Sequence, residues 1–383
     1  MKKLIVALVI LLPVALVAQQ TDSSPTKKLL GLAAPLPLNP SSSINGTPPS
    51  SAAESEARDT LASQTSTHST KTRATRKPSR PRSEGSMVGY VDDAIVASQI
   101  RLRFDAGFHD NAPDRAEFFY GQYAGLDGPG PKSVVADLNF QQLYVRGEYA
   151  SNQRLSFFAE LPVRWIQPQL IVANLTPTST FTSQVGFSDI ATGFKLAAVA
   201  SPSQYLTFQF QAHLPSGNAS SGLGTGHSTV EPALLYYRRL SDKVTLEAET
   251  GDSHPIGGSS CQNPCESTNL TGPKSQGFAG DVFFYGVGPS YAAYRSQQVL
   301  IAPVIELVGW RVLGGLETIC VAGVLDCADQ VAVTADSTNM VNLKAGVRAM
   351  VGDHSSFYVG YGHQLTHEFW YKEILRAEYR YTF

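Results

Sequence analysis

The sequence predicts an all-β protein, a transmembrane antiparallel up-and-down β-barrel of about 12 strands that follows a signal peptide and a disordered linker. Two observations carry this prediction. From Gly89 onward, hydrophobic residues recur with a period of two, and the segments with this pattern are joined alternately by long and short connections. A period of two indicates strands, and alternating loop lengths are typical of bacterial outer-membrane barrels.

The first residues of the chain predict export. Lys2 and Lys3 precede an apolar run over residues 4–17, which is the layout of a secretory signal peptide. We assign the signal peptide to residues 1–18, because the run is shorter than the roughly 20 residues of a membrane-spanning helix. An uncleaved anchor is the alternative. A lipoprotein is not predicted, because no cysteine precedes Cys261.

Residues 19–87 are predicted to form a disordered periplasmic linker, and residues 88–383 the outer-membrane barrel. The linker is rich in serine, threonine and proline and poor in aromatic residues, so it cannot bury a core. Its last third is basic and is suited to contact an anionic surface such as lipid headgroups. A solvated spacer is the alternative interpretation.

Two stretches show the strand pattern most clearly. The final segment LRAEYRYTF places Leu375 and Ala377 on one face and Arg376 and Glu378 on the other, and residues 100–108 alternate in the same way. In a membrane barrel the apolar face meets lipid and the charged face lines the lumen. The predicted strands are 97–108, 136–149, 153–164, 187–198, 204–214, 228–239, 243–252, 279–293, 298–312, 338–350, 355–363 and 372–383.

The connections between these strands alternate in length. The long links are 110–132, 165–186, 215–227, 253–278 and 313–337, the short links are 150–152, 199–203, 240–242, 294–297 and 351–354, and the final link, 364–371, is of modest length. An even strand count places both termini in the periplasm. A strand of about 11 residues at about 3.4 Å each, tilted near 45°, rises about 26 Å, close to the height of the apolar band.

Two features fit this pattern poorly. Pro162, Pro232, Pro289 and Pro303 fall within or at the ends of predicted strands, where proline usually marks a bulge or a strand end. The strands 279–293 and 298–312 are also apolar on both faces. They either pack against an inward plug or belong to a secreted soluble β-protein, which is the alternative to the barrel.

The four cysteines form two close pairs, and both pairs fall in predicted long loops: Cys261 with Cys265, and Cys320 with Cys327. Disulfides are permitted in an exported protein, and local pairing is predicted, although the sequence leaves three connectivities open. The spacing fits zinc poorly. No metal and no cofactor are predicted.

A glycine cluster, GLGTG at residues 222–226, suggests a phosphate-binding loop at first sight. Such a loop needs a helix after it. The residues that follow, HSTVEPALLYYRRL, alternate as a strand does. The cluster is therefore predicted to be a loop between two strands and not a nucleotide site.

The same region resembles a known family. The segment GFSDIATGFKL at 186–196 and the segment at 206–251, which begins LTFQFQAHLPSGNASSGLGTG, are similar to the outer-membrane channel family named for the MetA pathway of phenol degradation. Its pattern is matched by Gly186, Asp189, Leu214, Pro215, Gly217 and the whole of GLGTG, with Ser188, Ser216 and Asn218 as departures. The resemblance implies a β-barrel with a transport function. It does not identify the solute, because the family name is a poor guide to substrate.

The carboxyl terminus is similar to another signal. Phe383 ends the chain, and Tyr381 and Tyr379 precede it at alternate positions. This arrangement resembles the signal by which the outer-membrane assembly machinery recognises its clients. A plain amphipathic strand is the alternative.

Strand alternation predicts a lumen lined by charges of both signs. The inward candidates are Arg101, Arg103, Asp105, Arg146, Glu148, Glu160, Asp189, Lys195, Glu247, Glu249, Lys344, Arg348, Arg376, Glu378 and Arg380. In a water-filled pore such rings set ion selectivity. In a narrow barrel they form a cross-strand network of ion pairs instead. Twelve strands leave a lumen between that of an eight-stranded barrel and that of a general porin.

These features predict an outer-membrane channel or transporter, not an enzyme, for passive passage of small solutes, hydrophobic or aromatic ones among them. The expected partners are outer-membrane lipid, the assembly machinery and a small solute. The near-neutral charge, 30 basic against 32 acidic residues, gives no sign of a nucleic-acid partner, and the oligomeric state is not predicted. The alternatives are a structural or adhesive barrel with a blocked lumen, and an esterase that uses His213 near Ser216 or His363 near His367, for which no third catalytic group is found.

Overall fold

The computed structural model describes residues 85–113, 115, 118–119, 130–131, 135–171, 181–257, 278–320, 330–335 and 338–383. The predicted signal peptide and most of the predicted linker lie outside these residues, so those assignments stay predictions. Within the described residues, no helix is long and apolar enough to cross a membrane. The short helix η3 spans Ala219–Ser221.

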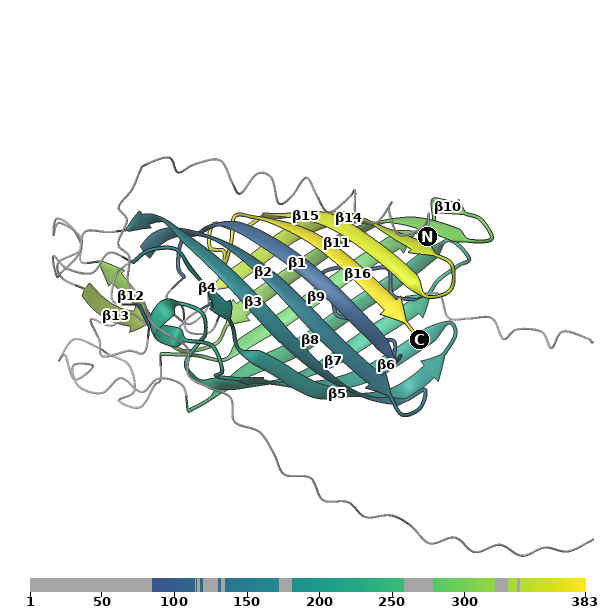
Figure 1. Ribbon diagram of the computed structural model, residues 1–383, viewed down its shortest axis with the longest axis horizontal. Coiled ribbons are helices and arrows are strands. Elements are labelled where there is room, and N and C mark those ends of the chain that lie inside the picture. Colours follow the sequence, from purple (N-terminus) through teal and green to yellow (C-terminus); the bar gives the residue numbers. More distant parts are fainter. Residues whose placement is uncertain are drawn as a thin grey trace, which may run out of the picture. The chain divides into compact units, whose positions relative to one another are not determined.

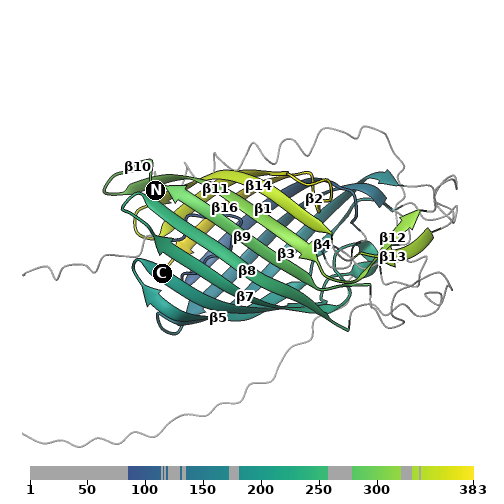
Figure 2. The ribbon, with the colours of Figure 1, turned by 180° about the vertical axis from the view of Figure 1, so that it is seen from behind.

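The described chain forms a closed antiparallel barrel of 12 strands (Figures 1 and 2). Its elements are β1 Gln99–Asp110, β2 Val135–Ala150, β3 Leu155–Ile171, β4 Gln184–Phe187, β5 Ile190–Ser201, β6 Gln204–Leu214, β7 Ser228–Arg239, β8 Val244–Ile256, β9 Val282–Tyr291, β10 Tyr294–Arg295, β11 Val299–Val312, β14 Asn339–Val351, β15 Ser355–Gln364 and β16 Glu373–Thr382. β4 and β5 together make one barrel strand, and β10 is a two-residue extension beside β11. The predicted fold class is confirmed.

The barrel closes where its first and last strands meet. Residues 99–108 of β1 pair with residues 373–382 of β16, and every other barrel strand pairs with its neighbours in sequence. Closure leaves no open sheet edge, which lipid could not satisfy by hydrogen bonding. The short turns, the start of β1 and the C-terminus lie at one end, the short-turn end (Figure 1).

Several predicted strand ends were wrong on the opposite side of the barrel, the long-loop end. β3 continues to Ile171 and β8 to Ile256 instead of ending at residues 164 and 252, and the predicted strand 187–198 is broken between β4 and β5. A further hairpin, β12 Leu316–Cys320 with β13 Gln330–Thr334, occupies a predicted loop. Strand residues that extend beyond the lipid do not need an apolar outer face. The alternation of apolar and polar residues that marks the membrane-spanning part is therefore absent from these strand extensions.

All four strand prolines lie inside strands, next to an interruption of pairing. Pro162 faces the break between β4 and β5, and Pro232 lies where β7 is unpaired with β8, between Val230 and Ala233. Pro289 and Pro303 lie at the interrupted pairing of β9 with β11. Proline lacks the amide donor of a ladder hydrogen bond, so it is tolerated where one neighbour is not hydrogen-bonded.

The outer face of the barrel is apolar. Exposed large hydrophobic residues on the strands include Ile100, Leu102, Val145, Leu161, Leu196, Leu234, Val287, Ile305, Leu343, Val347, Val359 and Leu375. Exposed aromatic residues gather near the short-turn end, among them Tyr149, Phe157, Tyr291, Tyr294, Tyr381 and Phe383. An apolar band beside an aromatic girdle is the surface that a barrel presents to lipid.

A charge introduced into this band should destabilise the barrel. Ile305 lies mid-strand in β11 and is 57% exposed. We expect Ile305→Arg to lower the free energy of unfolding in lipid vesicles by about 2–4 kcal/mol, because arginine at the bilayer midplane is poorly solvated. Leu240→Arg, in a short turn, should change it by about 0–1 kcal/mol. Equal effects in the denaturant titrations would contradict the assignment of the outer face to lipid.

The chain before β1 lies inside the barrel. We call residues 85–98 the lumenal segment; Val88 and Ala94 within it are fully buried. Gly85 lies beside Met350 near the short-turn end, and the segment returns to that end to begin β1. It therefore folds into the lumen and out again. No such segment was predicted, since β1 was expected to follow the linker directly.

The lumenal segment explains the two strands that are apolar on both faces. Val88 and Val91 belong to the same buried cluster as Val304 and Val308 of β11. On β9, a Cβ at Gly288 would lie 2.6 Å from Val88 Cγ1, so only glycine permits this approach. The inward plug, one of the two alternatives for these strands, is the correct one.

Candidate functional site

The lumen has two walls of opposite charge. The acidic wall, on β7, β8 and β11, carries Glu231, Glu247, Glu249 and Glu306. The basic wall lies on β14, β16, β1, β2, β3, β5 and the break between β4 and β5. It carries Lys344, Arg348, Arg376, Arg380, Arg101, Arg103, Arg146, Arg164 and Lys195 together with Asp105, Glu148, Glu160, Asp189 and Glu378. The basic wall thus has nine basic side chains against five acidic ones.

The acidic wall binds the amide groups of the lumenal segment. Glu306 accepts hydrogen bonds from the backbone N–H groups of Gly89 (3.1 Å), Tyr90 (2.8 Å) and Val91 (2.8 Å). Glu247 accepts from Met87 N–H at 2.7 Å, and Glu249 from Asp92 N–H at 2.7 Å. Because the acceptors are carboxylates, these hydrogen bonds are stronger than those between neutral groups.

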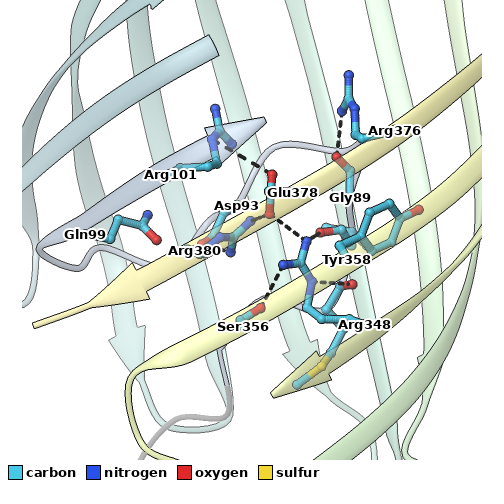
Figure 3. A network of polar contacts seen from close by, with 12 residues as sticks. Gly89, Asp93, Gln99, Arg101, Arg348, Ser356, Tyr358, Arg376, Glu378 and Arg380 are labelled. Atoms are coloured by element: carbon cyan, nitrogen blue, oxygen red, sulfur yellow. Dashed lines mark hydrogen bonds and ion pairs between the residues drawn. The ribbon is translucent and has the colours of Figure 1, made fainter. Parts of the chain in front are cut away.

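The basic wall binds the carbonyl groups of the same segment (Figure 3). Arg348 donates to the carbonyl oxygens of Met87 and Val88, and Arg376 donates to that of Gly89. The three peptide groups from Met87 to Tyr90 are therefore oriented with their N–H groups toward glutamate and their C=O groups toward arginine. The charge separation across the lumen matches the backbone polarity of the segment.

The basic wall is also a network of ion pairs (Figure 3). Glu378 Oε1 lies 2.9 Å from both Arg348 Nη2 and Arg380 Nη2, and Arg380 Nη1 lies 2.8 Å from Asp93 of the lumenal segment. At the barrel seam, Arg376 donates two hydrogen bonds to Asp105, at 2.6 and 2.7 Å. Buried charges require such partners.

A chamber of about 350 Å³ remains in the lumen. Tyr90 and Asp92 of the lumenal segment line it, as do charged residues of both walls. Aromatic side chains also line it, among them Phe118, Phe119, Phe140, Tyr144, Phe284, Trp310, Trp370 and Tyr371. The rings of Phe118 and Trp370 are stacked with their centroids 4.8 Å apart. The size and mixed lining are those of a small-molecule site.

The glycine cluster forms a loop fastened by one carboxylate. Asp189 accepts hydrogen bonds from the N–H groups of Gly217 (2.9 Å) and Thr225 (2.7 Å) and from the Thr225 hydroxyl (2.9 Å). A Cβ at Gly224 would lie 2.6 Å from Asp189 Oδ1. Gly222 ends η3 with a positive φ of 73°. The glycine cluster is therefore a loop between β6 and β7, as predicted, and Asp189 holds it in place.

The predicted inward residues all lie on the lumen side of the wall. Twelve of the fifteen are buried, and the side chains of Arg103 and Arg376 are 13% and 10% exposed. Lys195 pairs with Glu148 at 3.2 Å, and Glu249 binds the lumenal segment. A cross-strand network of ion pairs was one of the two predicted roles. The other role, lining an open pore, stays a prediction.

The structure gives the position of some other predicted residues but does not test the role predicted for them. Tyr379, Tyr381 and Phe383 end the chain at β16, and their assembly role stays a prediction. Cys261, Cys265 and Cys327 lie outside the described residues, and only the backbone of Cys320 is described.

The residues of the esterase alternative have separate partners. Ser216 Oγ donates to Ser188 O and accepts from Ile190 N–H, whereas His213 Nε2 lies 3.0 Å from Glu231 Oε2. His363 lies 3.8 Å from Glu373, and both side chains are exposed. These contacts give the esterase alternative no support.

Residues 99–251, from β1 into β8, match the family model described as "Putative MetA-pathway of phenol degradation". Over these residues the chain is similar to that family. The predicted resemblance to the MetA-pathway family is confirmed, and the matched segment includes the Asp189 loop. A closed, even-stranded barrel with an apolar exterior lies in the bacterial outer membrane, as predicted.

Solved barrels resemble the chain in fold. The COG4313 outer membrane channel from Pseudomonas putida F1 is 13% identical with a TM-score of 0.48, over 75% of this chain and 96% of that chain. The beta domain of the Bordetella autotransporter BrkA is 13% identical with a TM-score of 0.42, over 75% and 100%. The NanC porin is 7% identical with a TM-score of 0.38, over 74% and 98%. No curated protein matches the chain.

Proposed function

We propose that the protein is a gated outer-membrane channel for passive passage of small solutes, and that the lumenal segment is its gate. The observation that carries this proposal is the position of residues 85–98, which lie inside the lumen between the acidic and the basic wall. A purely structural barrel of 12 strands has no need of a polar lumen, since small barrels fill their interior with side chains.

The contacts of the segment suit a part that leaves and returns. It is held mainly by hydrogen bonds from its backbone to fixed charges, and water can replace these bonds one by one once the lumen is hydrated. Its apolar residues form two separate clusters, one with β9, β11 and Tyr358 of β15, the other with β5, β6 and β7. Withdrawal toward the short-turn end would join the chamber to the periplasm.

Single-channel recording in planar bilayers tests the proposal. The full-length protein is compared with a variant in which residues 85–96 are replaced by a glycine–serine stretch of equal length. We expect short, rare openings for the full-length protein and sustained current for the variant, with conducting time increased by about tenfold or more because the barrier is gone.

Folding of both proteins is checked by the gel-mobility change of unheated barrels. A folded variant that inserts but carries no current would contradict the channel proposal. That result would favour the structural or adhesive barrel with a blocked lumen.

A further inference from the structure

We propose that the chamber is a binding site for a small organic carboxylate with a flat apolar body. Arg146 binds the carboxylate group of this ligand, and in the closed state the side chain of Asp92 occupies the same position beside the arginines. This inference rests on the proposed channel function and names the class of solute that the channel selects.

The first step is an excess of arginine at one place on the wall. Arg146 pairs in register with Arg101 on β1 and with Glu160 on β3. Glu160 is already bound by Arg101 at 3.0 Å and by Arg103 at 3.5 Å. Three guanidinium groups thus surround Glu160. Arg101 and Arg103 each have a second carboxylate nearby, Glu378 at 4.0 Å and Asp105 at 3.5 Å.

Arg146 is the arginine left over. It is 5% exposed and lines the chamber, and its one specific contact among the described residues is with the face of the Phe158 ring, 3.6 Å from the ring centroid. No carboxylate of the described chain lies within ion-pair distance of it. A buried guanidinium has five N–H donors to satisfy, so a carboxylate ligand would supply acceptors that the wall does not.

The second step is the position of Asp92 in the lumenal segment. Its Oδ2 accepts a hydrogen bond from Gln209 Nε2 at 2.8 Å, and it lines the same chamber. Burial alone would raise the pKa of Asp92, but the positive charges of Arg146 and Arg101 outweigh burial and hold this pKa below its usual value. The chain therefore places a movable carboxylate in the field of the unpaired arginine.

The third step is the apolar part of the ligand. The guanidinium of Arg103 lies over the Tyr144 ring at 3.7 Å. The ammonium of Lys344 lies 4.1 Å from the Tyr90 ring centroid and 5.2 Å from that of Trp310, and it donates to the Tyr371 hydroxyl. Cations and ring faces together suit a flat molecule that stacks by its body and is anchored by one negative group.

Equilibrium binding of benzoate to the full-length protein in detergent tests the site. Trp310 and Trp370 line the chamber, so benzoate should change tryptophan fluorescence, and calorimetry gives an independent affinity. Uncharged benzyl alcohol should bind more weakly by about tenfold or more, because it cannot form charge-assisted hydrogen bonds with a guanidinium.

Two variants and a control make the test specific. Arg146→Gln should weaken benzoate binding about tenfold, since one charge-assisted partner is lost, whereas Arg154→Gln, in an exposed short turn, should leave it unchanged. Asp92→Asn should tighten binding several-fold, because a competing carboxylate is removed. If Arg146→Gln does not fold, the affinity of Asp92→Asn for benzoate still tests the proposal.

The proposal is overturned if benzoate does not bind, if benzyl alcohol binds equally well, or if Asp92→Asn does not tighten binding. These results are separate from the conductance test. If benzoate binding depends on Arg146 but the protein never conducts, the binding-site proposal stands and the channel proposal is overturned. If the protein conducts but does not bind benzoate in this way, the channel proposal stands and the binding-site proposal is overturned.

Discussion

Glu306→Gln is expected to open the barrel without unfolding it. Glu306 is fully buried and accepts four hydrogen bonds, three from the lumenal segment and one from the Tyr358 hydroxyl at 3.0 Å. Glutamine keeps the shape but removes the charge and directs an NH₂ group at donors. If the substitution lowers the stability of the closed state, with the lumenal segment inside the barrel, by about 2 kcal/mol, the ratio of open to closed barrels rises about thirtyfold.

Single-channel open probability measures this effect, and susceptibility of residues 85–98 to protease reports the release of the segment directly. Glu368→Gln, in an exposed loop, is the matched control and should behave as the wild type does. An open probability for Glu306→Gln equal to that of the control would show that the glutamate contacts do not set the closed state.

The strands were predictable because lipid and water impose opposite demands on the two faces of each one. Every barrel strand overlaps a predicted segment, and even the charged residues Arg101 and Glu378 lie on the expected face. The strand ends beyond the lipid were not predictable, because pairing there is decided by hydrogen bonds between loops and leaves no period in the sequence.

The lumenal segment was missed for a different reason. Most of its residues, GSMVGYVDDAIVAS, are small or apolar, without a strand period. The hydrogen bonds of its backbone N–H groups from Met87 to Asp92 go to side chains and not to the backbone of a neighbouring strand. Indirect signals did exist. Glu247 and Glu249 on β8 are opposite Gly288 and Gly286 of β9, so these inward glutamates have no side chain facing them from that strand. Both signals indicate a backbone held against that wall.

Arg146 shows the limit of the sequence prediction at the site. Its inward direction followed from alternation, but its lack of a partner depends on Arg101 and Arg103 competing for Glu160 across three strands. Register and side-chain rotamers decide that competition, and neither is encoded in a local pattern.

Asp105→Ala is expected to destabilise the barrel more than any other single change in the lumen. Asp105 lies on β1 opposite Arg376 of β16, where the barrel closes, and it also lies 3.5 Å from Arg103 Nε. Its removal leaves two arginines at the seam without this carboxylate. Breaking a buried ion pair by removing one partner costs about 3–5 kcal/mol, which urea unfolding of the vesicle-inserted barrel measures.

A double-mutant cycle separates the stability lost with the Asp105–Arg376 ion pair from the destabilisation caused by leaving one buried charge unpaired. Arg376→Met combined with Asp105→Ala should recover much of the stability lost in Asp105→Ala, because no guanidinium is then stranded at the seam. Arg376 also binds Gly89 O, so the double variant should still hold the lumenal segment less firmly than the wild type. Additive losses in the cycle would show that the two residues do not act as a pair. Recovered stability with an increased open probability would show that the seam also helps to keep the gate closed.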